Sequence, residues 1–270
     1  MFTHFVFGSN EPAAAEKFYD AVLPVLGFRR LGGGIDGALA YGHGGGLPHV
    51  VIMRPADGRP FRRGNGYHVA FHAGDEETVR RFHATALAAG GSDEGGPGLR
   101  LNYAPDYYGA YLRDPDGNKL QAVTYRAGRK AGAGGDVVSH ITLGSDDPAR
   151  SGSFYEGLLA PLGLARLPAE ETEGEDRAYG HAGCALPVVF PQRSFDGRPA
   201  APTHGSYAVL RAPSRAAVSA FHRAGLRLGG RELAPPADGA AAGANGGPAG
   251  FGAGIADPDG NAVYARCPDA

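Results

Sequence analysis

Two histidines and one glutamine occupy positions from which their side chains could meet around a metal ion. His4 and His68 lie in segments that alternate polar and apolar residues, HFVF and GYHVAF, and Gln121 lies in KLQAV. Successive side chains of a strand point to opposite faces, so we expect the apolar neighbours to face a helix and these three polar side chains to project from the other face. Two imidazoles and an amide oxygen on one surface are a possible ligand set for a divalent metal. A hydrogen-bonded core or rim position is the alternative for each histidine.

Tyrosines cluster just before the last of these segments. The stretch at 99–117 holds Tyr103, Tyr107, Tyr108 and Tyr111, together with Arg100 and Asn102. Phenols can donate hydrogen bonds to an oxygen anion or carry a proton, which makes Tyr103, Tyr108 and Tyr111 candidate catalytic residues. The alternative is an aromatic strand edge, because tyrosine is common in sheets.

These candidates sit on a repeat that runs through the whole chain. The segment at 3–28 returns at 139–164, AYGH occurs in both halves, and RDPDGN returns as ADPDGN. The spacing between equivalent residues only grows along the chain, which indicates one duplicated unit with small insertions in the second copy. Motifs kept in both copies are therefore interpreted as scaffold, and DPDGN as a tight turn rather than a calcium loop.

Each half repeats one smaller pattern twice. A strand is followed by an amphipathic helix and then by three short strands, with helices expected to start at Pro12 and after Asp75. The later strands of the first half are expected at 38–42, 48–54, 100–104, 108–113 and 119–125. One helix for several strands joined by hairpin-length connections predicts an α+β fold.

The chain is long enough for two domains of ordinary size. A polar, glycine-rich stretch at 127–136 is expected to link a first domain at 1–126 to a second at 137–270. The formal charge of -2 argues against nucleic acid and anionic membranes as partners. Two cysteines, no long apolar run and no visible signal peptide predict a cytoplasmic protein without a disulfide framework.

The module order and three motifs resemble the vicinal oxygen chelate superfamily. The motifs are FYDAVLPVLGF in the first helix, HVAFHA on the strand that restarts the pattern, and DPDGN before the last strand. That superfamily includes glyoxalase I, fosfomycin-resistance thiol transferases, extradiol dioxygenases and bleomycin-binding resistance proteins. The resemblance implies two tandem glyoxalase-like domains, each of two paired βαβββ modules that form a curved mixed sheet with a cleft. It leaves open whether modules pair within a domain, between domains or between chains, and whether the protein is a monomer or a homodimer.

The resemblance also implies a ligand set. Metal-using members commonly take His, His and Glu from the first strands of the modules and from a last strand, and the matching residues here are His4, His68 and Gln121. The amide at Gln121 departs from the pattern, and a neutral ligand holds a divalent cation more weakly. A fourth ligand position used by some lyases falls near Val51 and is apolar.

The second half keeps less of this set. His140 matches the first histidine, but Tyr207 stands in the place of His68 and Tyr264 in the place of Gln121. We therefore expect the first domain to hold the active site and the second to be degenerate.

Two functions fit these residues. The favoured one is an enzyme that uses a divalent metal (Fe, Mn, Zn or Ni) in the first domain for lyase, isomerase, transferase or oxygenase chemistry on adjacent oxygens of a small substrate. The alternative is a metal-free protein of the bleomycin-resistance type that sequesters a small molecule.

Overall fold

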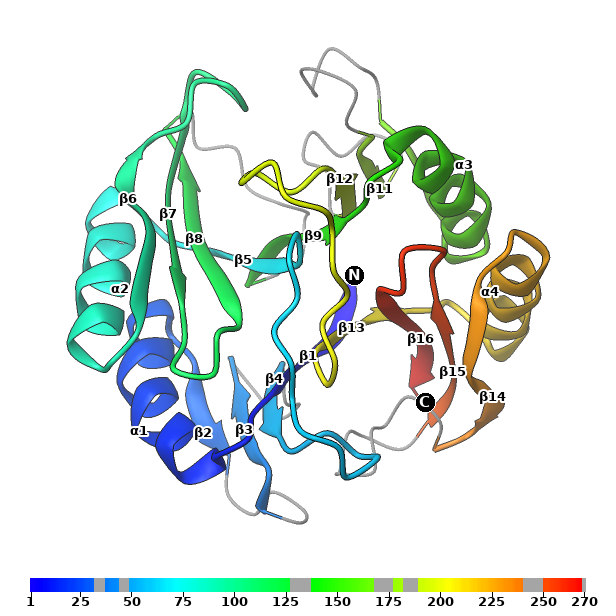
Figure 1. Cartoon of the computed structure of the whole chain (residues 1–270), viewed down its shortest axis with the longest axis horizontal. Coiled ribbons are helices and arrows are strands. Elements are labelled where there is room, and N and C mark those ends of the chain that lie inside the picture. The colour runs from blue at the N-terminus through cyan, green and yellow to red at the C-terminus, as the bar shows by residue number, and fades with distance from the viewer. Residues whose placement is uncertain are drawn as a thin grey trace.

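Helices cover the outside of two mixed sheets in the computed structural model (Figure 1). The structure describes the chain at 1–31, 37–43, 49–126, 137–167, 177–181, 189–239 and 250–268, so the predicted linker at 127–136 lies outside the described residues. No helix in the described ranges combines the length and apolarity needed to cross a membrane.

The first sheet joins the two ends of the chain. Its strands are β1 (Phe2–Gly8), β2 (Arg29–Leu31), β3 (Leu39–Gly42), β4 (Val50–Met53), β13 (Tyr207–Arg211), β14 (Arg231–Asp238), β15 (Gly250–Ala256) and β16 (Ala262–Pro268). They are ordered β14-β15-β16-β13-β1-β4-β3-β2. The first module of the chain therefore shares a sheet with the last.

The second sheet joins the two middle modules. Its strands are β5 (His68–His72), β6 (Ser92–Leu99), β7 (Tyr107–Arg113), β8 (Lys119–Tyr125), β9 (Val138–Gly144), β10 (Leu164–Arg166), β11 (Tyr179–His181) and β12 (Val189–Gln192). They are ordered β10-β11-β12-β9-β5-β8-β7-β6.

Both sheets are built across the two halves of the sequence. The first strands of two modules pair antiparallel at the centre of each sheet, β1 with β13 and β5 with β9, while the first and last strands within a module run parallel. The predicted α+β class and the four repeated strand–helix–strand modules are confirmed. The module pairing that the sequence left open is settled in favour of exchange between halves.

The helices bury one apolar face each against the sheets. They are α1 (Pro12–Val22), α2 (Glu76–Ala88), α3 (Pro148–Leu159) and α4 (Arg215–Arg227). The carboxylate of Asp75 caps α2 by accepting from the Thr78 amide at 2.7 Å, and Asp147 caps α3 in the same way. Phe18 of α1 and Phe82 of α2 belong to one continuous core that also includes strand residues of both sheets. The opposite face of each sheet, turned away from the helices, is called its inner face below.

One predicted strand is misplaced. The expected strand at 100–104 is largely a turn, and the edge strand is β6, Ser92–Leu99, which pairs with β7. Its sequence, SDEGGPGL, contains three glycines and a proline and shows no apolar alternation. Pairing with its neighbour therefore defines this strand, rather than its own propensity.

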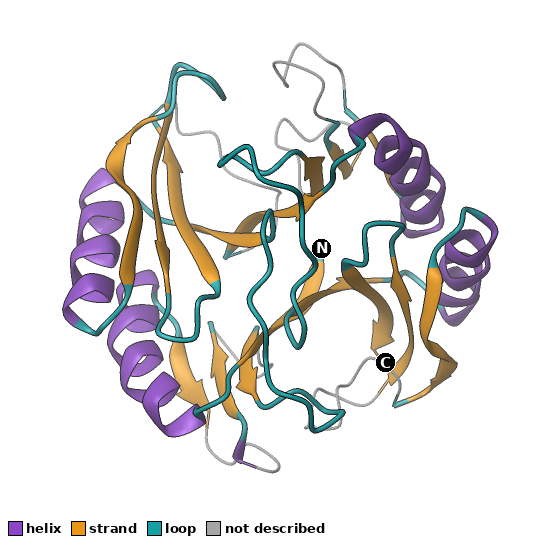
Figure 2. Cartoon of the chain, viewed as in Figure 1, coloured by secondary structure: helices purple, strands orange, loops and turns teal. Residues whose placement is uncertain are grey.

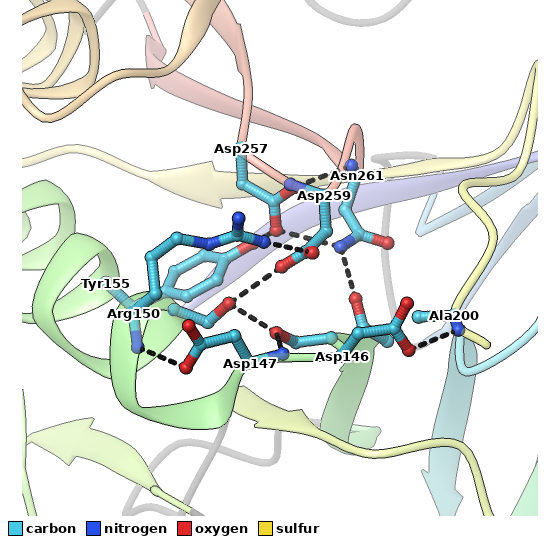
Figure 3. A network of polar contacts seen from close by, with 11 residues as sticks. Asp146, Asp147, Arg150, Tyr155, Ala200, Asp257, Asp259 and Asn261 are labelled. Atoms are coloured by element: carbon cyan, nitrogen blue, oxygen red, sulfur yellow. Dashed lines mark hydrogen bonds and ion pairs between the residues drawn. The ribbon is translucent and has the colours of Figure 1, made fainter. Parts of the chain in front are cut away.

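The duplicated DPDGN turns connect the two sheets. In the second half, Asp257 accepts the Tyr155 hydroxyl at 2.6 Å and the Asn261 amide at 2.8 Å, while Asn261 Nδ2 also donates to the Gly144 carbonyl of β9 at 2.8 Å (Figure 3). Asp259 extends the network to Arg150 of α3. The first half repeats this arrangement with Tyr19, Asp114, Asn118 and Gly8. The turn interpretation of DPDGN is confirmed, and each copy acts as a staple between sheets.

Two crossover segments carry the chain from one sheet to the other. They span 54–67 and 193–206, and they run past each other at the centre of the molecule as extended loops (Figure 2). Antiparallel bridges between Arg62 and His204 and between Asn65 and Ala201 hold them together. Each crossover thereby lies beside the other, close to the inner faces of the sheets.

Candidate functional site

The strand register brings His68, Gln121 and His140 onto the inner face of the second sheet. Ala70 of β5 pairs with Gln121 on β8 and with His140 on β9, and His68 lies two residues before Ala70 on the same strand. Residues paired across strands share a face, as do alternate residues of one strand. The neighbours Val69 and Phe71 point into the helix-covered core. Two imidazoles and one amide therefore gather around a small alanine.

His4 is not part of this group. It lies on β1, and β1 pairs with β13 of the first sheet instead of with β5. His4 pairs with Val209, which in turn pairs with Tyr264. Val6 pairs with Tyr207. Both tyrosines therefore lie on the inner face beside His4. We expected His4, His68 and Gln121 to lie together, but the structure places His4 on the first sheet and the other two residues on the second. His140, attributed to a degenerate domain, takes the place predicted for His4.

Burial keeps both imidazoles of the second sheet neutral. Burial lowers the pKa of His140 to about 3, helped by His72, and holds the pKa of His68 well below its usual range, helped by His140 and then by Lys119. The two rings are perpendicular, with centroids 5.9 Å apart. Thr142 Oγ1 lies 3.2 Å from Nε2 of His68. The site thus offers hydrogen bonds from neutral rings rather than positive charge from imidazolium.

The amide of Gln121 is fixed with its oxygen unused. Nε2 donates to the Tyr107 hydroxyl at 2.5 Å, which orients the group. Gln121 is 0% exposed, and its side chain raises the pKa of the adjacent His68 against the larger effect of burial. Its Oε1 has no hydrogen-bond partner among the described residues. A buried acceptor without a partner costs about 1–3 kcal/mol, so this oxygen favours a ligand that brings a donor.

The predicted tyrosines divide between the two faces. Tyr111 of β7 lies opposite Gln121, and its ring is perpendicular to that of His68 at 5.6 Å. Tyr103 precedes β7 and packs 5.2 Å from Tyr107. Tyr108 instead points into the helix-covered core, where its hydroxyl accepts from Arg80 of α2. The structure therefore places Tyr103 and Tyr111 near the site and turns Tyr108 away from it, because adjacent strand residues alternate in direction.

A cationic group borders the site. Glu94 Oε2 lies 3.3 Å from Lys119 Nζ, and Glu94 Oε1 accepts from Arg113 at 2.6 Å. Two cations thus share one carboxylate. Lys119 and Arg113 both help to depress the pKa of His68, which indicates that positive charge acts on the inner face. The alternation of KLQAV puts Lys119 on the face of Gln121, so this residue could have been found from sequence.

The position that could complete a four-residue set is aromatic. Phe190 of β12 pairs with Thr142 of β9 as Gln121 pairs with Ala70, and its ring lies 5.0 Å from that of His140. A carboxylate is therefore lacking at the fourth register position as well as at Gln121.

These donors do not fit a tightly held divalent cation. All are neutral, Nε2 of His68 already contacts Thr142, and two cationic side chains stand nearby. Ca²⁺ and Mg²⁺ prefer carboxylate ligands, and the repulsion of nearby cationic side chains weakens the binding of any divalent metal to a neutral set. Among the described residues, no three His, Cys, Asp or Glu side chains stand close enough together to hold a metal ion.

Comparisons with known proteins match the first part of the chain to a family model and the whole chain to a known fold. The family model described as the Glyoxalase/Bleomycin resistance protein/Dioxygenase superfamily matches residues 2–122. A glyoxalase I mutant from Zea mays is similar over 98% of this chain and 92% of its own, with 18% identity and a TM-score of 0.64. A putative dioxygenase from Bacillus subtilis is similar over 100% of this chain and 85% of its own, with 16% identity and a TM-score of 0.64. No curated protein matches.

A shorter protein is more similar in sequence. A glyoxalase/bleomycin resistance protein from Albidiferax ferrireducens shares 36% identity over 46% of this chain and 97% of its own, with a TM-score of 0.39. Its length corresponds to about one of the two copies of the repeated unit.

Proposed function

The chain belongs to the glyoxalase/bleomycin resistance/dioxygenase superfamily, and on that premise we propose that it binds a small, oxygen-bearing organic anion on the inner face of the second sheet without needing a metal. The protein would act by sequestering this molecule. The observation that carries the proposal is the combination on one face of neutral imidazoles, an unpartnered buried acceptor and an excess of cationic side chains.

Each group has a separate part in binding. The ammonium of Lys119 attracts the anionic group, since it shares the single carboxylate of Glu94 with Arg113. Oε1 of Gln121 accepts a hydrogen bond from a hydroxyl or amine of the ligand. His68 and His140, held neutral by burial, contribute N–H donors or ring acceptors according to tautomer.

The test is a calorimetric titration of the protein with small carboxylic acids in the presence of EDTA. We expect at least one acid to bind under these conditions, and we expect Lys119→Met to weaken it roughly ten-fold through loss of a charge-assisted bond. Lys17→Met, the same substitution at an exposed lysine of α1, is the matched control and should leave affinity unchanged. Binding that EDTA abolishes and one equivalent of Zn²⁺ restores would contradict the proposal, as would failure of every acid.

A metal-dependent enzyme is the second candidate. One observation favours it, namely that Tyr107 holds the amide of Gln121 with its oxygen free on the face that carries two imidazoles. His68, His140 and Gln121 would then be the ligands, and the metal would polarise oxygens of a substrate. Stoichiometric Zn²⁺ or Ni²⁺ in the purified protein, lost in a His68→Ala, His140→Ala double variant, would favour this candidate.

A further inference from the structure

An exposed phenylalanine stands over the proposed site on one crossover only. Phe195 belongs to the crossover at 193–206 and is 55% exposed. Its ring lies 6.1 Å from that of Tyr103 in a perpendicular arrangement. The other crossover carries the same DGRP motif, but Ala56 stands where this one has Phe195. The aromatic side chain therefore belongs to the second sheet's site and is not required by the repeated scaffold.

Lys119 links this phenylalanine to the interior of the site. Its Nζ lies 5.8 Å from the centroid of the Phe195 ring and 5.2 Å from that of Tyr111. Burial is the main factor that lowers the pKa of Lys119, and Glu94 opposes it. The ammonium thus sits between an inner aromatic ring and an exposed one.

The surrounding charges leave the site cationic. Arg100 lies 5.7 Å from the Tyr111 ring centroid and donates to the Gly96 carbonyl, so it adds a third positive charge to those of Lys119 and Arg113. Glu94 pairs with two of the three. Two further carboxylates act on these cations, and each already has other partners. Asp196, which raises the pKa of Lys119 against the larger effect of burial, is bound by Arg198 and Asn65. Asp93, whose pKa is lowered first by His83 and further by Arg100, contacts His83.

The ammonium of Lys119 and the amide of Gln121 lie on the same face of one strand. The two are alternate residues of β8, so their Cα atoms stand about 7 Å apart along the strand. A ligand that meets both must therefore carry two polar groups. A carboxylate at Lys119 and a donor hydroxyl at Gln121 Oε1 would then leave the ring of the ligand beside Tyr111, Tyr103 and Phe195.

We propose that the ligand of this site is a planar aromatic acid that also carries a hydroxyl group, and that its ring packs against Tyr103 and Phe195. The carboxylate meets Lys119, and the hydroxyl donates to Oε1 of Gln121. This assignment rests on the proposed function and adds to it the class of ligand. Aromatic packing favours a flat ring over a puckered one, because offset and perpendicular ring contacts contribute beyond the area they bury.

The test titrates 4-hydroxybenzoate against three analogues, each lacking one feature. Benzoate lacks the hydroxyl, 4-hydroxybenzyl alcohol lacks the charge, and trans-4-hydroxycyclohexanecarboxylate lacks the aromatic ring. We expect each analogue to bind roughly ten-fold more weakly than 4-hydroxybenzoate. We also expect Phe195→Ala to weaken 4-hydroxybenzoate about ten-fold and to leave the cyclohexane analogue nearly unchanged.

The control is Leu226→Ala, which truncates another exposed apolar side chain on the remote helix α4 and should change nothing. If the cyclohexane analogue binds as tightly as 4-hydroxybenzoate, or if Phe195→Ala has no effect on either, the aromatic assignment is overturned while the proposed function stands. If no acid binds, both are overturned.

Discussion

The inner faces of the two sheets have the same strand arrangement, and one histidine position is common to both. His4 on β1 and His140 on β9 occupy equivalent positions and follow a hydroxyl residue whose oxygen contacts Nδ1, Thr3 at 3.1 Å and Ser139 at 3.0 Å. Burial lowers the pKa of His4 to about 4, and Arg266 contributes to the effect. The scaffold therefore fixes one buried, neutral imidazole on both faces.

The remaining positions separate the two faces. Where the second sheet has His68 and Gln121, the first has Tyr207 and Tyr264, whose rings are 4.6 Å apart. Around them the first sheet gathers an apolar cluster of Val6, Ala38, Val51 and Met53. The strand register therefore sets where chemistry can occur, while a few side chains decide on which face it occurs.

The largest effect on stability is expected from separating the two halves of the chain, because both sheets depend on strands from both halves. Expressed alone, 1–126 leaves β1 and β5 without β13 and β9, and 137–270 leaves the reverse. Because each sheet loses its central pairing, we expect neither half to unfold cooperatively as a monomer. Mixing the halves should restore cooperative unfolding in a urea titration followed by circular dichroism. Two halves that each unfold cooperatively as monomers would show that the sheets do not depend on exchange.

The second effect concerns pH and tests the histidines that the two faces share. A histidine whose folded-state pKa lies below the unfolded value of 6.5 contributes stability fully above pH 6.5, and this stability is lost as the pH falls toward the folded value. The pH range over which this stability is lost extends down to about pH 4 for His4 and to about pH 3 for His140. Each should remove ~1.4 kcal/mol per pH unit below 6.5. Urea titrations at pH 7 and pH 5 measure the loss, and His4→Gln and His140→Gln should reduce it equally. A loss that only one variant reduces would mean that the faces are not equivalent at this position.

A third prediction concerns the staples, where the two halves should behave alike. Asn118→Ala and Asn261→Ala each remove donors to a carboxylate and to a strand carbonyl in a buried network. We expect each to lower the free energy of unfolding by about 2 kcal/mol without changing ligand affinity. Thermal unfolding and calorimetry check the two parts. A large loss of affinity in either variant would place the staple in the binding site.

The smallest effect sharpens the difference between the faces. Gln121→Glu adds a carboxylate beside two histidines, whereas Tyr264→Glu adds one beside a single histidine. We expect Zn²⁺ affinity to rise by roughly ten-fold in the first variant, because a carboxylate offsets the charge of the cation, and to stay unchanged in the second. An unchanged affinity in Gln121→Glu would show that this side chain does not point at the imidazoles.

The repeated modules and the scaffold role of DPDGN could be predicted from the sequence, because periodicity and duplicated turn residues are local signals. The strand that pairs with β1 could not be predicted. The first strands of all modules alternate in the same way, so β1 could pair with β5 or with β13 on pattern alone. The misplacement of His4 follows from that one ambiguity. Phe195 was missed because its position depends on a crossover, and only its contrast with Ala56 could have indicated it.

We expect the ligand to bind on the inner face of the second sheet and not on that of the first. The direct measurement is nitrogen NMR of side-chain-labelled histidine during titration with 4-hydroxybenzoate and trans-4-hydroxycyclohexanecarboxylate, with signals assigned from single histidine variants. We expect saturable nitrogen chemical-shift changes for His68 and His140 and none for His4. A saturable shift of His4, or titrations that leave His68 and His140 unchanged, would contradict it.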